Sequence, residues 1–283
     1  MVAIIFGLLT AAFFATSSLC NARASRHMGS WAVVGWAMLI GLLLTIPMIV
    51  IGGIPRMDAA TVTWLAISGI GNVGGLILTS FAYRMGKVGV ISPIIATEGA
   101  IAAIISAAFG APIAPLVILT LTVIVVGVVL AGVAPDPAPL AHARPVLAVV
   151  LAIACAFAFG LSLFATGHLS GGLPVGMLLL PARIIGVVVL AAPLAATRRF
   201  TLSRRAAPLV IGMGIAEVVG FVCYTIAAAH DIAIASVLVS QFAPMATLAA
   251  FFLFKERLGR LQILGFVVII AGVIGLSLVQ ATS

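Results

Sequence analysis

The sequence predicts an all-α integral membrane protein with ten transmembrane helices, arranged as two inverted five-helix repeats around a central cavity. The first observation is composition, since the chain is 64% hydrophobic and only 7% charged. Soluble domains carry about 25% charged residues, so a soluble fold is excluded. The second observation is a succession of apolar runs of membrane-spanning length. The third is that the spacing of these runs repeats after the midpoint of the chain.

Each predicted span is an apolar run long enough to cross about 30 Å of hydrocarbon at about 1.5 Å per residue. Glycine, proline or charged residues separate neighbouring runs. The stretch Met1–Cys20 lacks a basic n-region and a small-residue cleavage site in the expected place, so we predict a retained helix there. The predicted helices cover residues 2–22, 31–51, 60–82, 89–109, 115–133, 145–167, 173–195, 207–229, 232–254 and 261–279.

The proline-rich stretch Pro135–Arg144 lies at the midpoint and has the composition of a linker. It divides the chain into a first five-span repeat (1–134), a linker loop (135–144) and a second five-span repeat (145–283). A shift of about 144 residues places Ser18 on Ser162. Because each half has an odd number of spans, the second half enters the membrane from the opposite side. Inverted repeats of this kind build two alternating gates around one central site in many secondary transporters, so the architecture predicts transport.

The basic residues predict the orientation of the chain. Arg56 is the one lysine or arginine in the breaks after even-numbered spans. By the positive-inside rule we therefore expect the other breaks to be cytoplasmic and both termini to lie outside. We expect a multi-pass protein of the inner (plasma) membrane. The net charge of +8 reflects few acids rather than many bases, so we expect no nucleic-acid partner. The breaks after odd-numbered spans contain Arg23, Arg26, Arg84, Lys87, Arg144, Arg198, Arg199, Arg204, Arg205, Lys255, Arg257 and Arg260.

The last two apolar runs contain a motif with a family resemblance. A mid-helix proline is followed by a glutamate in a short charged turn, and then by a glutamine and glycines: Pro244, Glu256, Gln262, Gly265 and Gly272. This pattern resembles the closing motif of EamA-type transporters in the drug/metabolite transporter superfamily. The resemblance covers the whole chain, although the first half has Ala100 where the second half has Pro244, and Pro112 in place of the glutamate.

The resemblance implies a central cavity lined mainly by spans 1, 3, 4, 6, 8 and 9. It also implies a small polar or amphipathic metabolite as substrate, commonly an amino acid that is exported. Many members of the family are drawn with both termini inside the cell, whereas the basic residues of this chain favour both termini outside.

Three ionisable residues lie well within predicted spans: Glu98, Arg183 and Glu217. A charge at this depth costs about 2.5–3.5 kcal/mol on insertion scales, so each residue needs a reason. We expect Glu98 and Glu217 to contact substrate or carry protons, the alternative being a structural hydrogen bond. Arg183 pairs with a carboxylate of the protein or with one on a substrate, since its guanidinium suits either.

Stripes of polar residues add further candidates for substrate binding. In the third span Asn72, Thr79 and Tyr83 share one helical face. In the eighth span Glu217 and Tyr224 do the same, and the two stripes occupy corresponding spans of the two halves. Ser240 and Gln241 lie in the ninth span. The alternative for these residues is helix packing, in which small and hydroxyl side chains allow close approach.

The sequence therefore predicts a secondary transporter that exports amino acids or similar small zwitterions by alternating access, either proton-linked or facilitative. The alternative substrate class is cationic, drug-like compounds moved by efflux. An intramembrane enzyme or a receptor is the remote alternative, because an enzyme would need a convergent nucleophile or metal set. We find no metal spacing and no nucleotide fingerprint. We therefore expect no enzymatic activity, cofactor or nucleotide, and a monomer or weak oligomer with a small-molecule substrate and the lipid bilayer as partners.

Overall fold

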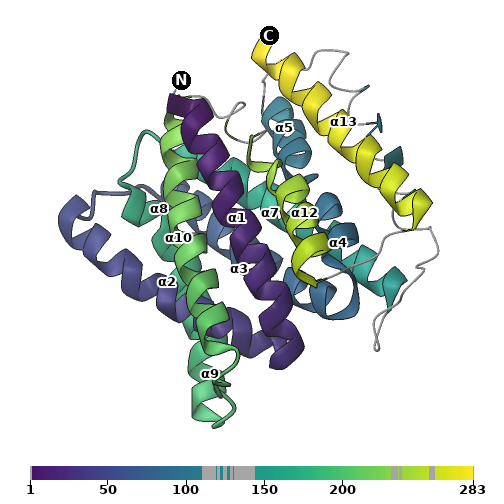
Figure 1. Ribbon diagram of the computed structural model, residues 1–283. Coiled ribbons are helices and arrows are strands. Elements are labelled where there is room, and N and C mark those ends of the chain that lie inside the picture. The colour runs from purple at the N-terminus through teal and green to yellow at the C-terminus, as the bar shows by residue number, and fades with distance from the viewer. Residues whose placement is uncertain are drawn as a thin grey trace.

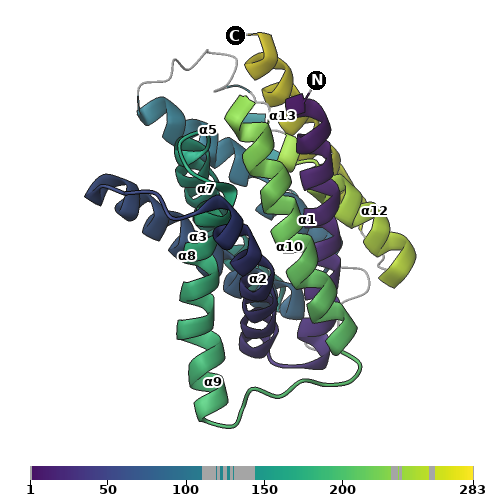
Figure 2. The same cartoon turned by 90° about the vertical axis from the view of Figure 1, so that its left-hand side faces the viewer.

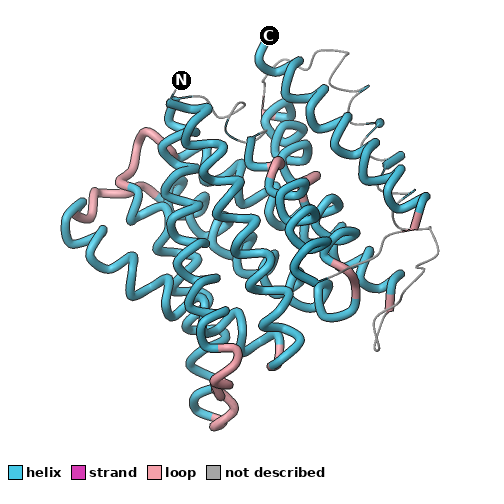
Figure 3. The backbone as a smooth tube through the Cα atoms, viewed as in Figure 1, coloured by secondary structure: helices cyan, strands magenta, loops and turns pink. Residues whose placement is uncertain are grey.

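The computed structural model describes residues 2–109, 144–230, 238–254 and 259–282, together with isolated residues 119, 122–123, 126–127, 130 and 235. All regular secondary structure in these residues is helical (Figure 3). The first half contains α1 (Val2–His27), α2 (Ser30–Gly52), α3 (Ala59–Met85), α4 (Val88–Ile95) and α5 (Glu98–Ala108). The second half contains α7 (Pro145–Leu169), α8 (Val175–Gly186), the π-helix η1 (Val187–Ala191), α9 (Ala192–Ala196), α10 (Ala207–His230), α12 (Phe242–Phe254) and α13 (Arg260–Thr282).

Six segments of the described residues are long and apolar enough to cross a membrane. They coincide with the first, second, third, sixth, seventh and eighth predicted spans. The fifth predicted span, 115–133, falls almost entirely outside the described residues, so the count of ten helices stays a prediction. The six segments are Ile5–His27, Ser30–Gly52, Ala59–Met85, Pro145–Leu169, Val175–Ala196 and Ala207–His230.

The fourth predicted span is not one helix, and the prediction of a continuous helix over 89–109 was wrong. α4 ends at Ile95 and α5 begins at Glu98. Pro93 in α4 has no N–H, and its ring crowds the preceding turn. One turn later the helical pattern is interrupted, because both the amide and the hydroxyl of Thr97 donate to the carbonyl of Ile94, at 3.2 and 2.8 Å.

The seventh predicted span also departs from a regular α-helix. Its middle, η1, has π-helical geometry, with the N–H of Ala192 donating to the carbonyl of Val187. Pro193 follows directly and lacks the N–H that an α-helix needs. A wider turn at this point therefore accommodates the proline without ending the span.

Two helix pairs make the most extensive contacts in the described structure, α3 with α7 and α1 with α10. α1 and α10 lie side by side in both views of the ribbon (Figures 1 and 2). A Cβ atom on Gly75 of α3 would lie 2.5 Å from the ring of Phe159 on α7, and one on Gly220 of α10 would lie 2.6 Å from the ring of Phe14 on α1. Both the glycines and the phenylalanines are related by the same shift along the chain. The two packings are therefore equivalent, and each joins one helix from either half.

The ends of the molecule agree with the distribution of basic residues. The N-terminus and the C-terminal end of α13 lie at one end in both views, and α9 with the loop that follows it lies at the other (Figures 1 and 2). That loop carries Arg198, Arg199, Arg204 and Arg205. Arg144 lies against the end of α3, where its amide donates to the carbonyl of Met85 at 3.1 Å.

Candidate functional site

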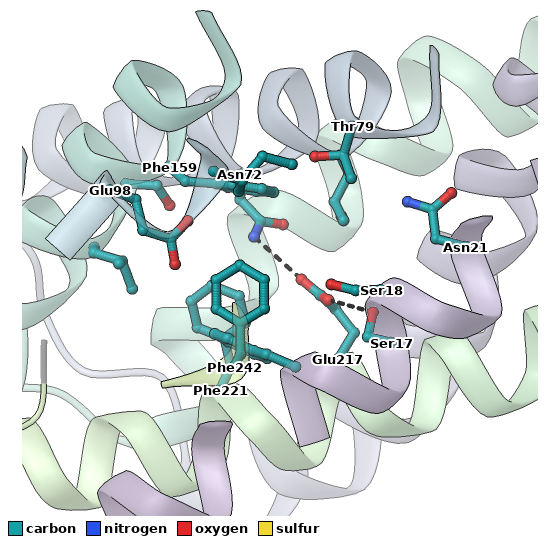
Figure 4. Close-up of a pocket in the computed structure, with 15 residues that line it drawn as sticks. Ser17, Ser18, Asn21, Asn72, Thr79, Glu98, Phe159, Glu217, Phe221 and Phe242 are labelled. Atoms are coloured by element: carbon teal, nitrogen blue, oxygen red, sulfur yellow. Dashed lines mark hydrogen bonds between the residues drawn. The ribbon is translucent and has the colours of Figure 1, made fainter. Parts of the chain in front are cut away.

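A pocket lies among the helices and is partly open to the outside. Its walls come from α1, α3, α7 and α10, with single residues at the end of α4 and the starts of α5 and α12 (Figure 4). These elements belong to the first, third, fourth, sixth, eighth and ninth predicted spans, the set that the family resemblance implied. The lining residues are Phe14, Ser17, Ser18, Asn21, Asn72, Leu76, Thr79, Ile95, Glu98, Phe159, Ser162, Leu163, Glu217, Phe221 and Phe242.

Glu98 reaches the pocket because the fourth span is broken. It is the first residue of α5 and only 4% exposed. The N-terminus of a helix carries partial positive charge, which stabilises a carboxylate placed there. Its carboxyl group faces the pocket (Figure 4), and no described residue donates a hydrogen bond to it. Glu98 therefore presents to the pocket a carboxyl group that accepts no hydrogen bond from the described residues.

Glu217 lies in the second half of the chain and is held by two helices of the first half. Ser17 of α1 donates a hydrogen bond to its Oε2 at 3.1 Å, and Asn72 of α3 donates to its Oε1 at 3.3 Å (Figure 4). Its side chain is 4% exposed, like that of Glu98. Asn72 and Glu217 are the first residues of the two polar stripes that the sequence suggested, and they meet directly in the structure.

Asn21 lies at the end of the pocket away from Glu98 (Figure 4). The hydroxyls of Ser25 and Ser80 donate to its Oδ1 at 2.9 and 2.7 Å, whereas its Nδ2 has no partner. Sequence reasoning did not single out this residue. The available signal was an amide inside an apolar helix, followed one turn later by a serine.

Phenylalanine rings form the apolar part of the wall. Phe14 and Phe221 pack with ring centroids 5.2 Å apart, and Phe159 and Phe242 complete the set. Sequence reasoning missed these residues as well. Their signal is the internal repeat, because Phe14 and Phe159 occupy equivalent places in α1 and α7.

Of the remaining predicted candidates, Tyr83 and Tyr224 do not line the pocket. The fully buried hydroxyl of Tyr83 lies 2.9 Å from that of Ser92, and the equally buried Tyr224 donates to the carbonyl of Leu163 at 3.0 Å. Thr79 does line the pocket, with its hydroxyl 2.8 Å from the Sγ of Cys155.

Ser240 and Gln241 form the turn that precedes α12. A shift of about 144 residues, as between Ser18 and Ser162, places this turn on Ala96–Thr97, the break between α4 and α5. Both halves therefore interrupt a helix at the pocket, with Glu98 following one break and Phe242 the other.

Four residues of the family motif, Pro244, Gln262, Gly265 and Gly272, lie in α12 and α13. Gly265 and Gly272 are buried in α13. Pro244 lies in α12 and Gln262 in α13, and their side chains fall outside the described part of the structure, as does the whole of Glu256.

Arg183 lies outside the lining of the pocket, in α8 where this helix crosses α2. Its side chain is 1% exposed, its Nη1 donates to the Sδ of Met38 at 3.5 Å, and its Nε has no partner. A Cβ atom on Gly41 would lie 2.9 Å from the Arg183 side chain, so the glycine makes room for it. No carboxylate of the described residues pairs with it, although the sequence suggested a protein carboxylate or a substrate as its partner.

The described residues contain no group of three histidine, cysteine or acidic side chains that could hold a metal ion. The arrangement is a pocket among apolar helices that is lined by two acids, amide and hydroxyl groups and aromatic rings.

Comparison with known proteins assigns the family. The profile of the EamA-like transporter family matches residues 1–133 and again residues 146–278. A protein of known crystal structure shares the fold, with a TM-score of 0.71 and 15% identity over 99% of this chain and 98% of that one. None of the curated proteins matches the sequence significantly. The two matches together span nearly the whole length of this chain. The chain therefore belongs to the EamA-like transporter family, a family of membrane transporters rather than enzymes.

Proposed function

We propose that this protein is a secondary transporter that exports small molecules carrying a protonated amine, with amino acids and similar zwitterions as the first class. The observation that carries the proposal is the pair of buried acids, Glu98 and Glu217, in one pocket with four phenylalanines. An ammonium group bound there compensates carboxylate charge that is costly inside a membrane. The aromatic rings receive the apolar part of the molecule and attract the cation over their faces.

The two acids have different roles in this proposal. Glu217 is already engaged by Ser17 and Asn72, which fix its position. Glu98 has no such partner, so it is the primary site for the ammonium group and for a proton. If the ammonium group and the proton compete for the Glu98 carboxylate, export of the substrate is coupled to entry of a proton. If no proton exchanges with the substrate at Glu98, transport is facilitative.

Alternating access is the mechanism that the architecture supports best. The equivalent packings of α3 with α7 and of α1 with α10 fit ten helices arranged as two inverted repeats around this pocket. The helix breaks at Ala96–Thr97 and Ser240–Gln241 lie beside the pocket in both halves. Interrupted helices at membrane depth are tolerated where they line a cavity, and they are natural places for a gate. The protein is expected in the inner (plasma) membrane.

Cationic, drug-like compounds are the second candidate class. The observation in their favour is that none of the described residues lining the pocket is a lysine or an arginine. Arg183, which could have bound a substrate carboxylate, lies against α2 instead. In this case compounds with a charged amine and no carboxylate would be the preferred substrates.

Counterflow in proteoliposomes tests the proposal. Vesicles are preloaded with one unlabelled compound, and uptake of labelled amino acids and labelled organic cations is followed across a panel. We expect uptake of some amino acids by the wild-type protein and a loss of about tenfold or more in the Glu98→Gln variant, since removal of a charged partner costs at least 1.4 kcal/mol in such sites.

Asp58→Asn is the matched control, because it removes a carboxylate outside the pocket. Asp58 is exposed at the start of α3, and its hydrogen bond from Thr61 lowers its pKa, so it is charged under assay conditions. Its removal should leave uptake unchanged. Uptake of cations alone would establish the second candidate, and a Glu98→Gln variant as active as wild type would overturn the role of Glu98.

A further inference from the structure

A buried amide at one end of the pocket indicates what the second end of the substrate is. Asn21 lies in α1 and is 1% exposed. Ser25 on the same helix and Ser80 on α3 both donate to its Oδ1, at 2.9 and 2.7 Å. The hydroxyl of Ser80 also donates to the carbonyl of Leu76 at 2.9 Å, so its proton is shared between two acceptors. Both serines lie on the Oδ1 side of the amide, and its NH₂ group faces the pocket (Figure 4).

The Nδ2 of Asn21 is a buried donor with no partner. An amide nitrogen carries two N–H groups, and leaving a buried donor unpaired is destabilising. A ligand that supplies the acceptor removes this cost. A hydrogen bond from a neutral donor to a charged acceptor is stronger than one between neutral groups, which favours an anionic oxygen.

The placement of Asn21 relative to the acids fits a molecule with two charged ends. Asn21 follows Ser17 by one turn of α1, a rise of about 6 Å, and Ser17 holds the carboxylate of Glu217. Glu98 lies at the other end of the pocket (Figure 4). An ammonium group near the acids thus leaves the opposite end of a small molecule within reach of Asn21.

We propose that Asn21 binds the carboxylate of the substrate and so selects zwitterions over simple amines. This inference rests on the proposed function and deepens it by naming the recognition group for the anionic end. It also explains how the pocket accepts a carboxylate without a lysine or arginine among its described lining residues. The amide carries no charge, so it does not compete with the ammonium group for Glu98 and Glu217.

The test compares substrates that differ only at the carboxylate. The probes are the protein amino acids and, for each one taken up in counterflow, its primary amide and its decarboxylated amine. In the Asn21→Asp variant, Ser25 and Ser80 can still donate to one oxygen, while the other places a negative charge in the pocket. We expect amino-acid uptake to fall about tenfold or more, and amine uptake to be unchanged or increased. The primary amide, which keeps an acceptor without charge, should lie between the two.

Asn72→Asp provides the matched contrast, because it makes the same chemical change beside Glu217. A further acid there should alter uptake of amino acids and amines in the same direction. Asn21→Ser gives a second variant without added charge, and this variant should lower amino-acid uptake and spare amine uptake. Thermal unfolding in detergent checks that each variant is folded.

Two results would overturn the inference while leaving the proposed function intact. One is an equal loss of amino-acid and amine uptake in the Asn21→Asp variant, which is the behaviour of a structural residue. The other is an Asn21→Asp variant that takes up amino acids and amines in the same ratio as the wild-type protein, with neither uptake reduced. A wild-type protein that takes up amines and no amino acid would overturn both the inference and the assignment of zwitterions as substrates.

Discussion

Glu98 and Glu217 are the same residue type in the same pocket, yet their surroundings differ. Glu217 accepts hydrogen bonds from two other helices, whereas Glu98 relies on the N-terminus of its own helix. A carboxylate has about four acceptor sites, so two of those on Glu217 are occupied by the protein, whereas Glu98 keeps all of its sites for a ligand. For this reason our proposal gives Glu98, rather than Glu217, the role of reversible binding site.

Arg183 leads to a prediction at the residue scale. Its buried guanidinium has a long contact to Met38 and an unpaired Nε, so its charge is poorly compensated in the described structure. Replacement of a buried charge by an apolar side chain of similar volume is often neutral or stabilising. We expect Arg183→Met to raise the stability by roughly 1–3 kcal/mol, measured as a higher midpoint of thermal unfolding in detergent.

Arg183→Ala serves as the comparison for this prediction. The small side chain leaves a cavity between α2 and α8, so this variant should be less stable than Arg183→Met. If Arg183→Met proved clearly less stable than wild type, the guanidinium would have a stabilising partner, and a structural role would replace the expectation of a poorly compensated charge.

At the scale of the elements, prolines show why helix breaks were hard to predict. Pro47 and Pro181 lie inside α2 and α8 and do not end them. Pro93 is followed by the helix break that precedes Glu98. Pro193 is instead preceded by the π-helical turn η1. All four residues lack an N–H, so the residue type does not decide the outcome. Whether neighbouring helices and side chains satisfy the freed backbone groups decides it.

The α3–α7 interface gives a prediction for packing. A Cβ atom on Gly71 would lie 2.6 Å from the backbone carbonyl oxygen of Ala158, an obstacle that cannot rotate away. Gly74, on the same helix, has nothing within 4 Å of its Cβ position. We expect Gly71→Ala to lower the stability by roughly 1–3 kcal/mol. Gly74→Ala should be neutral or stabilising by up to about 1 kcal/mol, because alanine favours the helix.

Thermal unfolding of the two variants side by side measures this difference. Equal stability of Gly71→Ala and Gly74→Ala would show that α3 and α7 are not in close contact at this point. Because both substitutions are on one helix and add the same methyl group, differences in helix propensity do not enter the comparison.

At the scale of the whole molecule, orientation in the membrane is the open prediction. The loop after α9 lies at the end opposite both termini (Figures 1 and 2) and carries several arginines. The loop after α2 carries only Arg56. By the positive-inside rule the first loop is cytoplasmic and the second is external.

Single cysteines report this orientation. In a background where Cys20, Cys155 and Cys223 are replaced, Ile54→Cys and Thr201→Cys place exposed thiols in the loops after α2 and α9. We expect a membrane-impermeant maleimide to label Ile54→Cys in intact cells, and Thr201→Cys only after permeabilisation. The reverse pattern would place both termini in the cytoplasm, as the family is often drawn.

The sequence alone determined the class of the protein, because membrane insertion depends on the length and apolarity of each run, and these are local properties. The six long spans, the transporter family and the positions of Glu98 and Glu217 within apolar runs were predictable for that reason. Which side chains meet in the pocket depended on helix rotation and on two helix breaks, which arise from packing between distant segments. Tertiary structure therefore decided that Asn21 and the phenylalanines line the pocket, and that Arg183 does not.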